Sequence, residues 1–180
     1  LEKLVKLAKK QNRNAQKQLY EMLAPKMLAL AQSYINNIFD AEDLLMQCFL
    51  KAFSQIKDCR DDHAFAGWLR RMVINDSISF IRKKKNIQFV DIKLADDFYE
   101  TDEFEFEEIN LTKLFLEIPD GYRIVFNLYV FEEKSHAEIA KSLQISEGTS
   151  KSQYSKAKKW ISAYLKNKQN EENNVRKIKI

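Results

Sequence analysis

Lysine side chains gather near the end of the chain, between residues 149 and 170. This stretch holds six lysines and no acidic residue. Ammonium groups spaced along one element can hold the phosphates of a nucleic acid. The alternative is a solvated basic helix in an ordinary bundle, with no ligand at all. The choice between the two depends on the element that carries the lysines.

A helix-turn-helix pattern precedes and includes these lysines. Ser135 and Glu138 have the capping-box spacing, which predicts a short helix with an apolar face made by Ala137, Ile139, Ala140 and Leu143. Leu143-Gln144-Ile145 supplies a tight turn. Ser146 is the predicted N-cap of the second helix, and Glu147 suits its first turn. Helix pairs of this kind insert the second helix into the major groove of DNA.

The second helix has one predicted inward stripe, formed by Ser150, Tyr154, Ala157, Ile161 and Leu165. The spacing of three or four residues puts these side chains on one face. The expected outward residues are Thr149, Lys151, Ser152, Ser155, Lys156 and Lys159.

No pattern typical of an enzyme is present in the sequence. There is no glycine-rich phosphate loop and no Gly-x-Ser-x-Gly motif. Cys59 and His63 are four residues apart, but His136 is distant and no second Cys/His pair exists, so we expect no zinc site. We interpret His63 as an exposed loop residue. We therefore expect no catalytic activity, no cofactor and no small-molecule substrate.

Composition favours a helical protein of one or two small domains. The chain has 180 residues, of which 45% are hydrophobic, with only 3 Gly and 2 Pro and a formal net charge of +4. Two cysteines make no disulfide framework, which suits a reducing compartment. No signal-peptide pattern or membrane-spanning apolar run is evident. We expect a cytoplasmic protein.

Residues 1–85 form the first predicted domain. Asp40 is the predicted cap of a long helix whose apolar stripe comprises Leu44, Leu45, Cys48, Ala52, Phe53 and Ile56. The polar stretch CRDDH at 59–63 separates it from a helix over 65–85. The predicted core residues of that helix are Phe65, Leu69, Met72, Val73 and Ile81. Four cations at 82–85 suit the negative end of its dipole.

Residues 86–108 are predicted to be an acidic linker, with nine acids from Asp91 to Glu108 against one lysine. Residues 109–166 form the second domain. Its first helix is interrupted at Ile118-Pro119, because the residue before proline is pushed out of the helical region. A second helix through 122–129 and the helix-turn-helix follow. Residues 167–180 are expected to be a flexible tail, so the predicted fold is all-α with two small helical domains.

Read together, the ordered segments resemble the bacterial sigma factors of the sigma-70 family. The segments are DAEDLLMQCFLKAF at 40–53, FAGWLRRMVINDSISFIRKKK at 65–85, and the stretch from Ile118 to Ile161. The size resembles the extracytoplasmic-function group, which keeps only the second and fourth sigma domains. The resemblance implies that 1–85 is sigma region 2 and that 109–166 is sigma region 4.

Roles in the first domain follow from this resemblance. Asp40, Glu42, Asp43 and Gln47 look like the residues that dock on the clamp helices of RNA polymerase. Arg60, Asp61, Asp62 and His63 lie in what looks like the loop that captures a flipped base of the −10 element. Trp68, Arg71 and Asn75 resemble neighbours that handle the melted strand, since an aromatic face suits a base and cations suit phosphates. Trp68 as a core aromatic remains an alternative. Arg82, Lys83 and Lys84 are expected to contact duplex phosphate.

In the second domain, the resemblance assigns the −35 element to Lys151, Ser152, Ser155 and Lys156. Thr149, near the helix N-terminus, is a further candidate for a phosphate contact. The sequence departs from the family's usual pattern at Ser150, Gln144, Gln153 and Lys156. Lysine lacks the bidentate fork of arginine, so the promoter preference of relatives does not transfer.

The implied partners are core RNA polymerase, promoter DNA and an anti-sigma factor, which in this family is often membrane-bound. The linker would run toward the RNA exit path of polymerase. Two alternatives stay open. One is a helix-turn-helix repressor or activator that binds an operator without polymerase, and the other is a helical adaptor whose basic faces bind an acidic protein.

Overall fold

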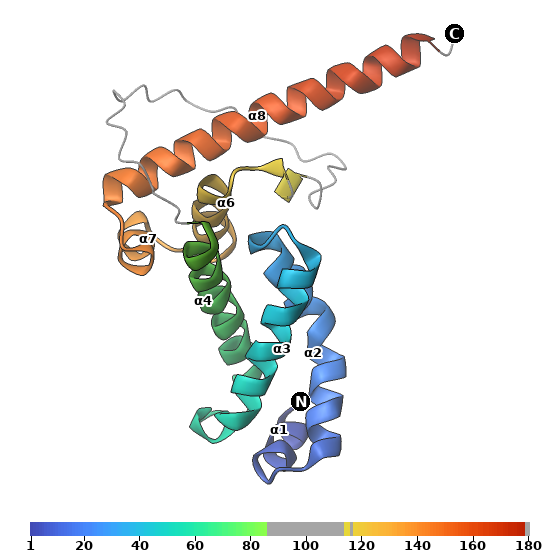
Figure 1. Ribbon diagram of the computed structural model, residues 1–180, viewed down its shortest axis with the longest axis vertical. Helices are drawn as coiled ribbons and strands as arrows, with labels where there is room; N and C mark the ends of the chain where they lie inside the picture. The colour runs from blue at the N-terminus through green and yellow to red at the C-terminus, as the bar shows by residue number, and fades with distance from the viewer. Residues whose placement is uncertain (86–113, 116, 179–180) are drawn as a thin grey trace. The chain divides into compact units, whose positions relative to one another are not determined.

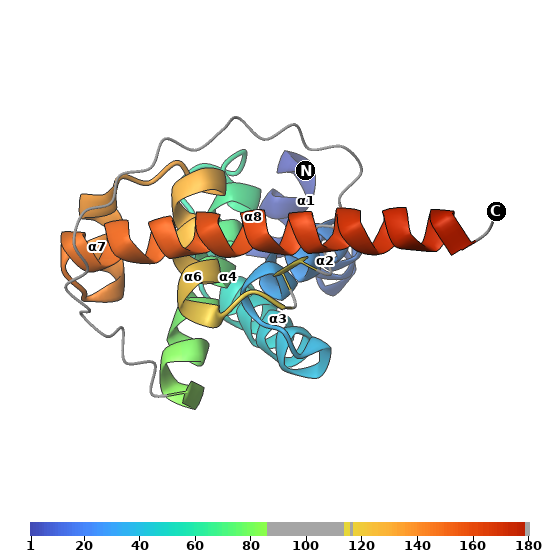
Figure 2. The ribbon, with the colours of Figure 1, turned by 90° about the horizontal axis from the view of Figure 1, so that it is seen from above.

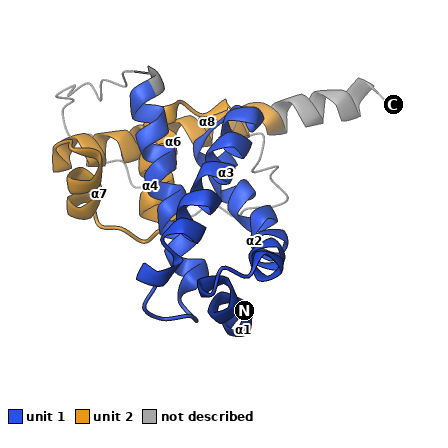
Figure 3. Cartoon of the chain, turned by 60° about the horizontal axis from the view of Figure 1, so that its bottom comes forward, with its two compact units in different colours: residues 1–86 blue, residues 87–180 orange. Residues whose placement is uncertain are grey.

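The computed structural model describes residues 1–85, 114–115 and 117–178, with side chains up to residue 83 in the first segment and up to 168 in the last. The chain divides into two compact units, residues 1–86 (unit 1) and 87–180 (unit 2) (Figure 3). All regular elements in the described ranges are helical, which confirms the all-α prediction. None of the described helices is long and apolar enough to cross a lipid bilayer.

Unit 1 is a bundle of α2 (Arg13–Tyr34), α3 (Ile38–Ser54) and α4 (Phe65–Lys85), which contact one another (Figure 1). The short α1 (Glu2–Lys9) packs on α2 and also contacts η1, a 3-10 turn at Ile56–Asp58. The predicted helix over 65–85 is confirmed, and its five predicted core residues are all buried. Most of the predicted α3 stripe is also buried, whereas Phe53 is half-buried.

The N-cap of α3 is Asn37, so the prediction that Asp40 caps this helix was wrong. The Asn37 side-chain oxygen accepts hydrogen bonds from the backbone N–H groups of Phe39, at 2.9 Å, and Asp40, at 3.2 Å. Asp40 instead lies within the first turn, where a carboxylate still favours the positive end of the helix dipole.

Unit 2 contains α6 (Asp120–Phe126), α7 (His136–Leu143) and the long α8 (Glu147–Ile178). Figure 2 shows α7 against the N-terminal end of α8. The predicted helix through 122–129 is present, with α-helical geometry up to Phe126 and a single π-helical turn, η2 (Asn127–Phe131), directly after it. One core cluster joins Leu114 and Ile118 to Ala157 and Ile161 of α8.

The structure continues α8 to Ile178, beyond the expected start of a tail at residue 167. No glycine or proline follows Gly148 in this segment, so nothing in the sequence breaks the helix. The flexibility of 167–180 stays a prediction. The acidic linker at 86–108, the predicted helix residues Ile109, Leu111 and Leu116, and the side chain of Lys84 lie outside the described residues.

Candidate nucleic-acid interface

The polar residues expected to dock on a partner lie along α3. Glu42, Asp43 and Gln47 are exposed, and Asp40 is half-buried. Residues 43 and 47 are one turn apart, so their side chains share a face of the helix. The structure therefore brings a carboxylate and an amide together on an accessible surface of unit 1.

Exposed apolar residues that were not predicted from the sequence lie beside this polar pair. Phe39 is 73% exposed and Leu50 is 64% exposed, and Ile38 and Met46 are about half exposed. Phe39, Asp43, Met46 and Leu50 follow one another at intervals of three or four residues. Several large apolar side chains exposed on one helix are typical of a site of protein association. The available signal was a second apolar stripe in α3, beside the stripe that forms the core.

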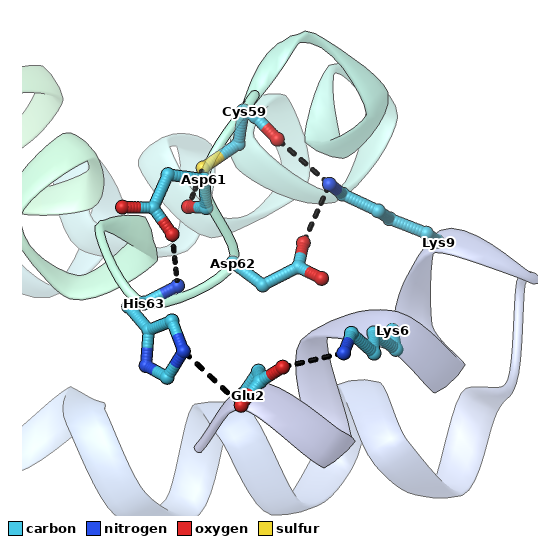
Figure 4. A network of polar contacts seen from close by, with 7 residues as sticks. All are labelled: Glu2, Lys6, Lys9, Cys59, Asp61, Asp62 and His63. Carbon is cyan, nitrogen blue, oxygen red and sulfur yellow. Dashed lines mark hydrogen bonds and ion pairs between the residues drawn. The ribbon is translucent and has the colours of Figure 1, made fainter.

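The loop at 59–63 is held by a network of polar contacts (Figure 4). Lys9, at the end of α1, donates to the carbonyl oxygen of Cys59 at 2.7 Å and lies 2.6 Å from Asp62 Oδ1. Inside the loop, the Asp61 carboxylate accepts a hydrogen bond from the His63 backbone N–H at 2.9 Å. The Cys59 thiol donates to the Asp61 carbonyl at 3.2 Å.

Because of these contacts, the four predicted loop residues are not equally accessible. Arg60 and Asp61 are exposed, whereas Asp62 faces Lys9 and its side chain is only 15% exposed. His63 Nε2 lies 3.1 Å from Glu2 Oε2, and Glu2 is also paired with Lys6. No sequence signal pointed to Lys9 or Glu2, because both are fifty or more residues from the loop.

The α4 candidates share a face of the helix, since residues 68, 71, 75 and 82 are spaced by three, four and seven. Arg71, Asn75 and Lys83 are exposed, and Arg82 is half-buried. Trp68 is also half-buried, with its ring centroid 6.0 Å from that of the buried Phe65. The indole therefore packs against a core side chain and remains partly accessible.

Both cysteines in the described part of the chain are buried free thiols. Burial, reinforced by the Asp76 carboxylate 3.6 Å away, raises the pKa of the Cys48 thiol to about 12. Burial also raises the pKa of Cys59. Within the described residues, no group of three or more His, Cys, Asp or Glu side chains could hold a metal ion.

The helix-turn-helix has the predicted local structure. Both halves of the capping box form, with Glu138 N–H donating to Ser135 Oγ and Ser135 N–H donating to the Glu138 carboxylate at 2.9 Å. Gln144 makes the turn in the left-handed region, with a φ of 58°. The side chain of Ser146 accepts from Thr149 N–H at 2.9 Å, as expected for the N-cap of α8.

The outward face of α8 carries most of the predicted DNA-binding residues. Lys151 is exposed and forms an ion pair with Glu147 at 2.9 Å. Ser152, Ser155 and Lys156 are half-buried. Thr149 was predicted on this face, which was wrong because it is 2% exposed and its hydroxyl lies 2.8 Å from that of Ser146. The buried arc of α8 is wider than predicted and also includes Gln153.

A polar and aromatic contact joins α7 to α8. His136 Nδ1 lies 2.9 Å from the hydroxyl of the buried Ser150, and the His136 ring stacks on Tyr129 with centroids 4.6 Å apart. Burial lowers the pKa of His136, and the nearby Lys151 lowers it further. The neutral imidazole is therefore the form that the folded unit favours.

Two family models match this chain. Residues 19–87 match the model of sigma-70 region 2, and residues 108–161 match the model of sigma-70, region 4. Together these segments span more than half of the chain.

Curated relatives and a solved structure agree with this. The chain is 26% identical over 181 residues to the ECF RNA polymerase sigma factor SigW of Bacillus subtilis (strain 168), covering 92% of this chain and 97% of SigW. It is 27% identical to ECF RNA polymerase sigma factor SigM of the same organism, covering 86% and 98%.

The fold is similar to that of CnrH, solved in complex with the cytosolic domain of CnrY. The TM-score is 0.52 and the identity is 19%, with 92% of this chain and 97% of CnrH covered. The chain therefore belongs to the sigma-70 family of RNA polymerase sigma factors, in its extracytoplasmic-function group, and directs promoter-specific initiation of transcription by core RNA polymerase.

Proposed function

We propose that this sigma factor divides its work among three surfaces. The outer face of α3 docks on core RNA polymerase, the 59–63 loop with α4 captures the −10 element, and α8 contacts the −35 element. The protein has no catalytic activity of its own and acts in the cytoplasm. Family membership favours this proposal over a repressor that ignores polymerase or an adaptor that ignores DNA.

The observation that carries the proposal is the exposed face of α3. Asp43 and Gln47 are flanked there by Phe39 and Leu50, which are 73% and 64% exposed. Interfaces combine an apolar centre with polar groups that set register. A large exposed phenylalanine is costly in water, so a partner surface that covers it accounts for its presence.

The proposed −10 surface combines exposed groups with one accessible aromatic. Arg60 and Asp61 stand at the tip of the loop, and Arg71 and Asn75 are exposed on α4. An aromatic ring such as Trp68 stacks on an unpaired base, while arginine holds phosphate. The same face extends toward Arg82 and Lys83, which we assign to duplex phosphate, together with Lys84.

The proposed −35 surface lies on the outer side of α8. Lys151 forms an ion pair with Glu147, and both side chains are more than half exposed. Such a pair contributes little free energy, so Lys151 can leave Glu147 and bind DNA at a small cost. Ser152, Ser155 and Lys156 complete the surface. We omit the Thr149 hydroxyl from it, because that group is buried against Ser146.

We also propose that an anti-sigma protein, bound to the membrane or free, covers these surfaces when the factor is idle. The similarity to CnrH, whose structure includes the cytosolic domain of CnrY, supports this. Purification of the factor from uninduced native cells should recover a protein other than polymerase. Recovery of polymerase alone would contradict it.

The docking surface is tested by transcription in vitro on genomic fragments. Wild-type factor is compared, at limiting concentration, with the double variant Asp43→Arg/Gln47→Ala, with Phe39→Ala and with core polymerase alone. At limiting concentration both variants should initiate less transcription than the wild-type factor. A saturating concentration of either variant should partly restore initiation. Glu21→Arg, a charge reversal at an exposed site on α2, serves as the matched control. Identical start sites without the factor, or a fully active docking variant, would contradict the proposal.

The −35 surface is tested by promoter binding of reconstituted holoenzyme. Lys151→Ala and Lys156→Ala should each weaken binding by about 1–3 kcal/mol if they contact bases. Lys166→Ala removes a lysine from an exposed position farther along α8. Unchanged affinity for both of the first two variants would remove them from the site.

A further inference from the structure

The 59–63 loop is fastened to α1 by one ammonium group. Lys9 Nζ lies 2.7 Å from the Cys59 carbonyl oxygen and 2.6 Å from Asp62 Oδ1 (Figure 4). These two acceptors stand on either side of Arg60 and Asp61. A single cation held by both therefore draws the ends of the loop together and ties them to the N-terminal helix.

Burial makes the Lys9–Asp62 ion pair stronger than the His63–Glu2 pair, which joins the same two segments. The side chains of Lys9 and Asp62 are 24% and 15% exposed, whereas those of His63 and Glu2 are 75% and 39% exposed. Exposed ion pairs contribute little, and shielded pairs are less screened by salt. Asp62 Oδ1 is buried, and the Lys9 ammonium 2.6 Å away is the positive charge that compensates it.

The segment of α1 that precedes Lys9 is closely packed. Val5 and Ala8 of α1 are fully buried, as is Ile56 in η1, which contacts α1 just before the loop. The backbone position of Lys9 is therefore set by close packing. Lys9 also precedes the segment matched by the sigma-70 region 2 model, which begins at residue 19.

We infer that Lys9 is a positioning residue for −10 recognition, an inference that rests on the proposed assignment of the 59–63 loop to that element. Lys9 turns Asp62 toward α1 and leaves Arg60 and Asp61 as the exposed tip. The loop then meets DNA in one conformation and loses little conformational freedom on binding. A loop released from α1 still reaches DNA but holds its contacts less accurately, so it discriminates less between bases.

The test compares Lys9→Met with Lys10→Met in reconstituted holoenzyme. Lys10 is the exposed neighbour, so both variants lose one charge from the same end of α1. Initiation is measured on a promoter selected by the wild-type factor and on copies with one base changed in the −10 or −35 element. For Lys9→Met, the preference for the unchanged −10 element should fall about tenfold, the scale of one lost charged hydrogen bond. The −35 preference should not change, and Lys10→Met should behave as wild type.

Hydrogen exchange of the free full-length protein gives a readout that needs no transcription. Backbone amides at 61–64 should exchange faster in Lys9→Met than in wild type or Lys10→Met. Lys9→Arg should restore slow exchange and −10 preference, because a guanidinium can contact both acceptors. If Lys9→Met fails to fold, Asp62→Asn, which keeps the bond to Cys59, should show the same changes to a smaller extent.

Two results would overturn the inference, and they differ. A folded Lys9→Met protein with wild-type exchange and wild-type −10 preference shows that Lys9 does not position the loop. Faster exchange in Lys9→Met, combined with a wild-type factor that ignores −10 substitutions, shows that the loop is tied by Lys9 but does not read that element. The second result also overturns the proposed loop assignment.

Discussion

The interiors of the two units differ in polarity. Among the described residues of unit 1, Ser77 is the one residue that is both polar and buried, and the other buried polar groups are single atoms such as the Tyr34 hydroxyl and Asp62 Oδ1. Unit 2 buries Arg123, Asn127, Thr149, Ser150 and Gln153 within a smaller set of apolar residues. Buried polar groups are costly unless they are hydrogen-bonded. Unit 1 therefore depends mainly on apolar packing, and unit 2 depends also on contacts of buried polar side chains.

Arg123 is the clearest example of a buried polar side chain that stabilises unit 2 through its contacts. Its guanidinium donates to the carbonyls of Phe115, at 2.9 Å, and Ile118, at 3.2 Å, and it pairs with Asp120. These carbonyls come just before Pro119, where a helix end leaves acceptors without partners. Burial lowers the pKa of Arg123, and Asp120 opposes this shift. The difference teaches that a unit with fewer buried apolar residues in its described part can use one buried charged side chain where the other unit uses apolar area.

Arg123→Met should produce the largest effect on this comparison. The substitution strands Asp120 and two carbonyls in the interior, which costs about 3–5 kcal/mol of the unfolding free energy of unit 2. The chain has two tryptophans, Trp68 in unit 1 and Trp160 in unit 2. In two single-tryptophan variants, phenylalanine replaces either Trp68 or Trp160. The fluorescence of the remaining tryptophan during denaturant unfolding then reports on one unit at a time. A loss shared equally by both units would contradict the comparison.

Leu69→Ala makes the reciprocal change in unit 1. Leu69 is fully buried in α4, and a truncation of this size costs about 2–5 kcal/mol, including the cavity left behind. The loss should appear in the Trp68 signal and leave the Trp160 transition in place. Leu50→Ala on the exposed face of α3 is the control, with little expected change in stability.

Gln144→Gly should stabilise unit 2 by up to about 1 kcal/mol. Gln144 has a φ of 58°, a backbone conformation that is less favourable for a residue with a side chain than for glycine. Glycine also increases the conformational entropy of the unfolded chain, which offsets part of the stabilisation. The midpoint of the Trp160 transition measures the gain. Gly introduced at Ser142, inside α7, should instead destabilise the unit.

The smallest expected effect is the pH dependence of unit 2 due to His136. Its pKa is lowered from 6.5 in the folded unit, so the unfolded chain binds the proton first as the pH falls. Stability should be highest above pH 6.5, decline below it, and level off below the lowered pKa. The lowered pKa values of Glu138 and Glu147 matter only below their usual 4.5, so the range between 4.5 and 6.5 isolates His136. In His136→Gln, the midpoint of the Trp160 unfolding transition should no longer vary with pH across this range. An unchanged pH dependence of the midpoint would show that another group is responsible.

The sequence predicted the elements whose signals are local. The capping box of Ser135 and Glu138, the N-cap at Ser146 and the helix over 65–85 each depend on residues within one or two turns. The same locality explains two errors. Asn37 took the capping position expected for Asp40, because either side chain can cap a helix. Thr149 turned inward because its hydroxyl meets Ser146, a contact that periodicity does not encode.

By itself, the sequence determined an all-α protein with a basic helix-turn-helix and an ordered set of sigma-like segments, since helical periodicity and caps are written in neighbouring residues. Only the tertiary structure decided that Lys9 holds the 59–63 loop, that Arg123 is buried against Phe115 and Ile118, and that Phe39 and Leu50 stay exposed. The tie from Lys9 joins residues fifty or more positions apart. Burial depends on which face of a helix its neighbours cover, and packing of whole elements settles that.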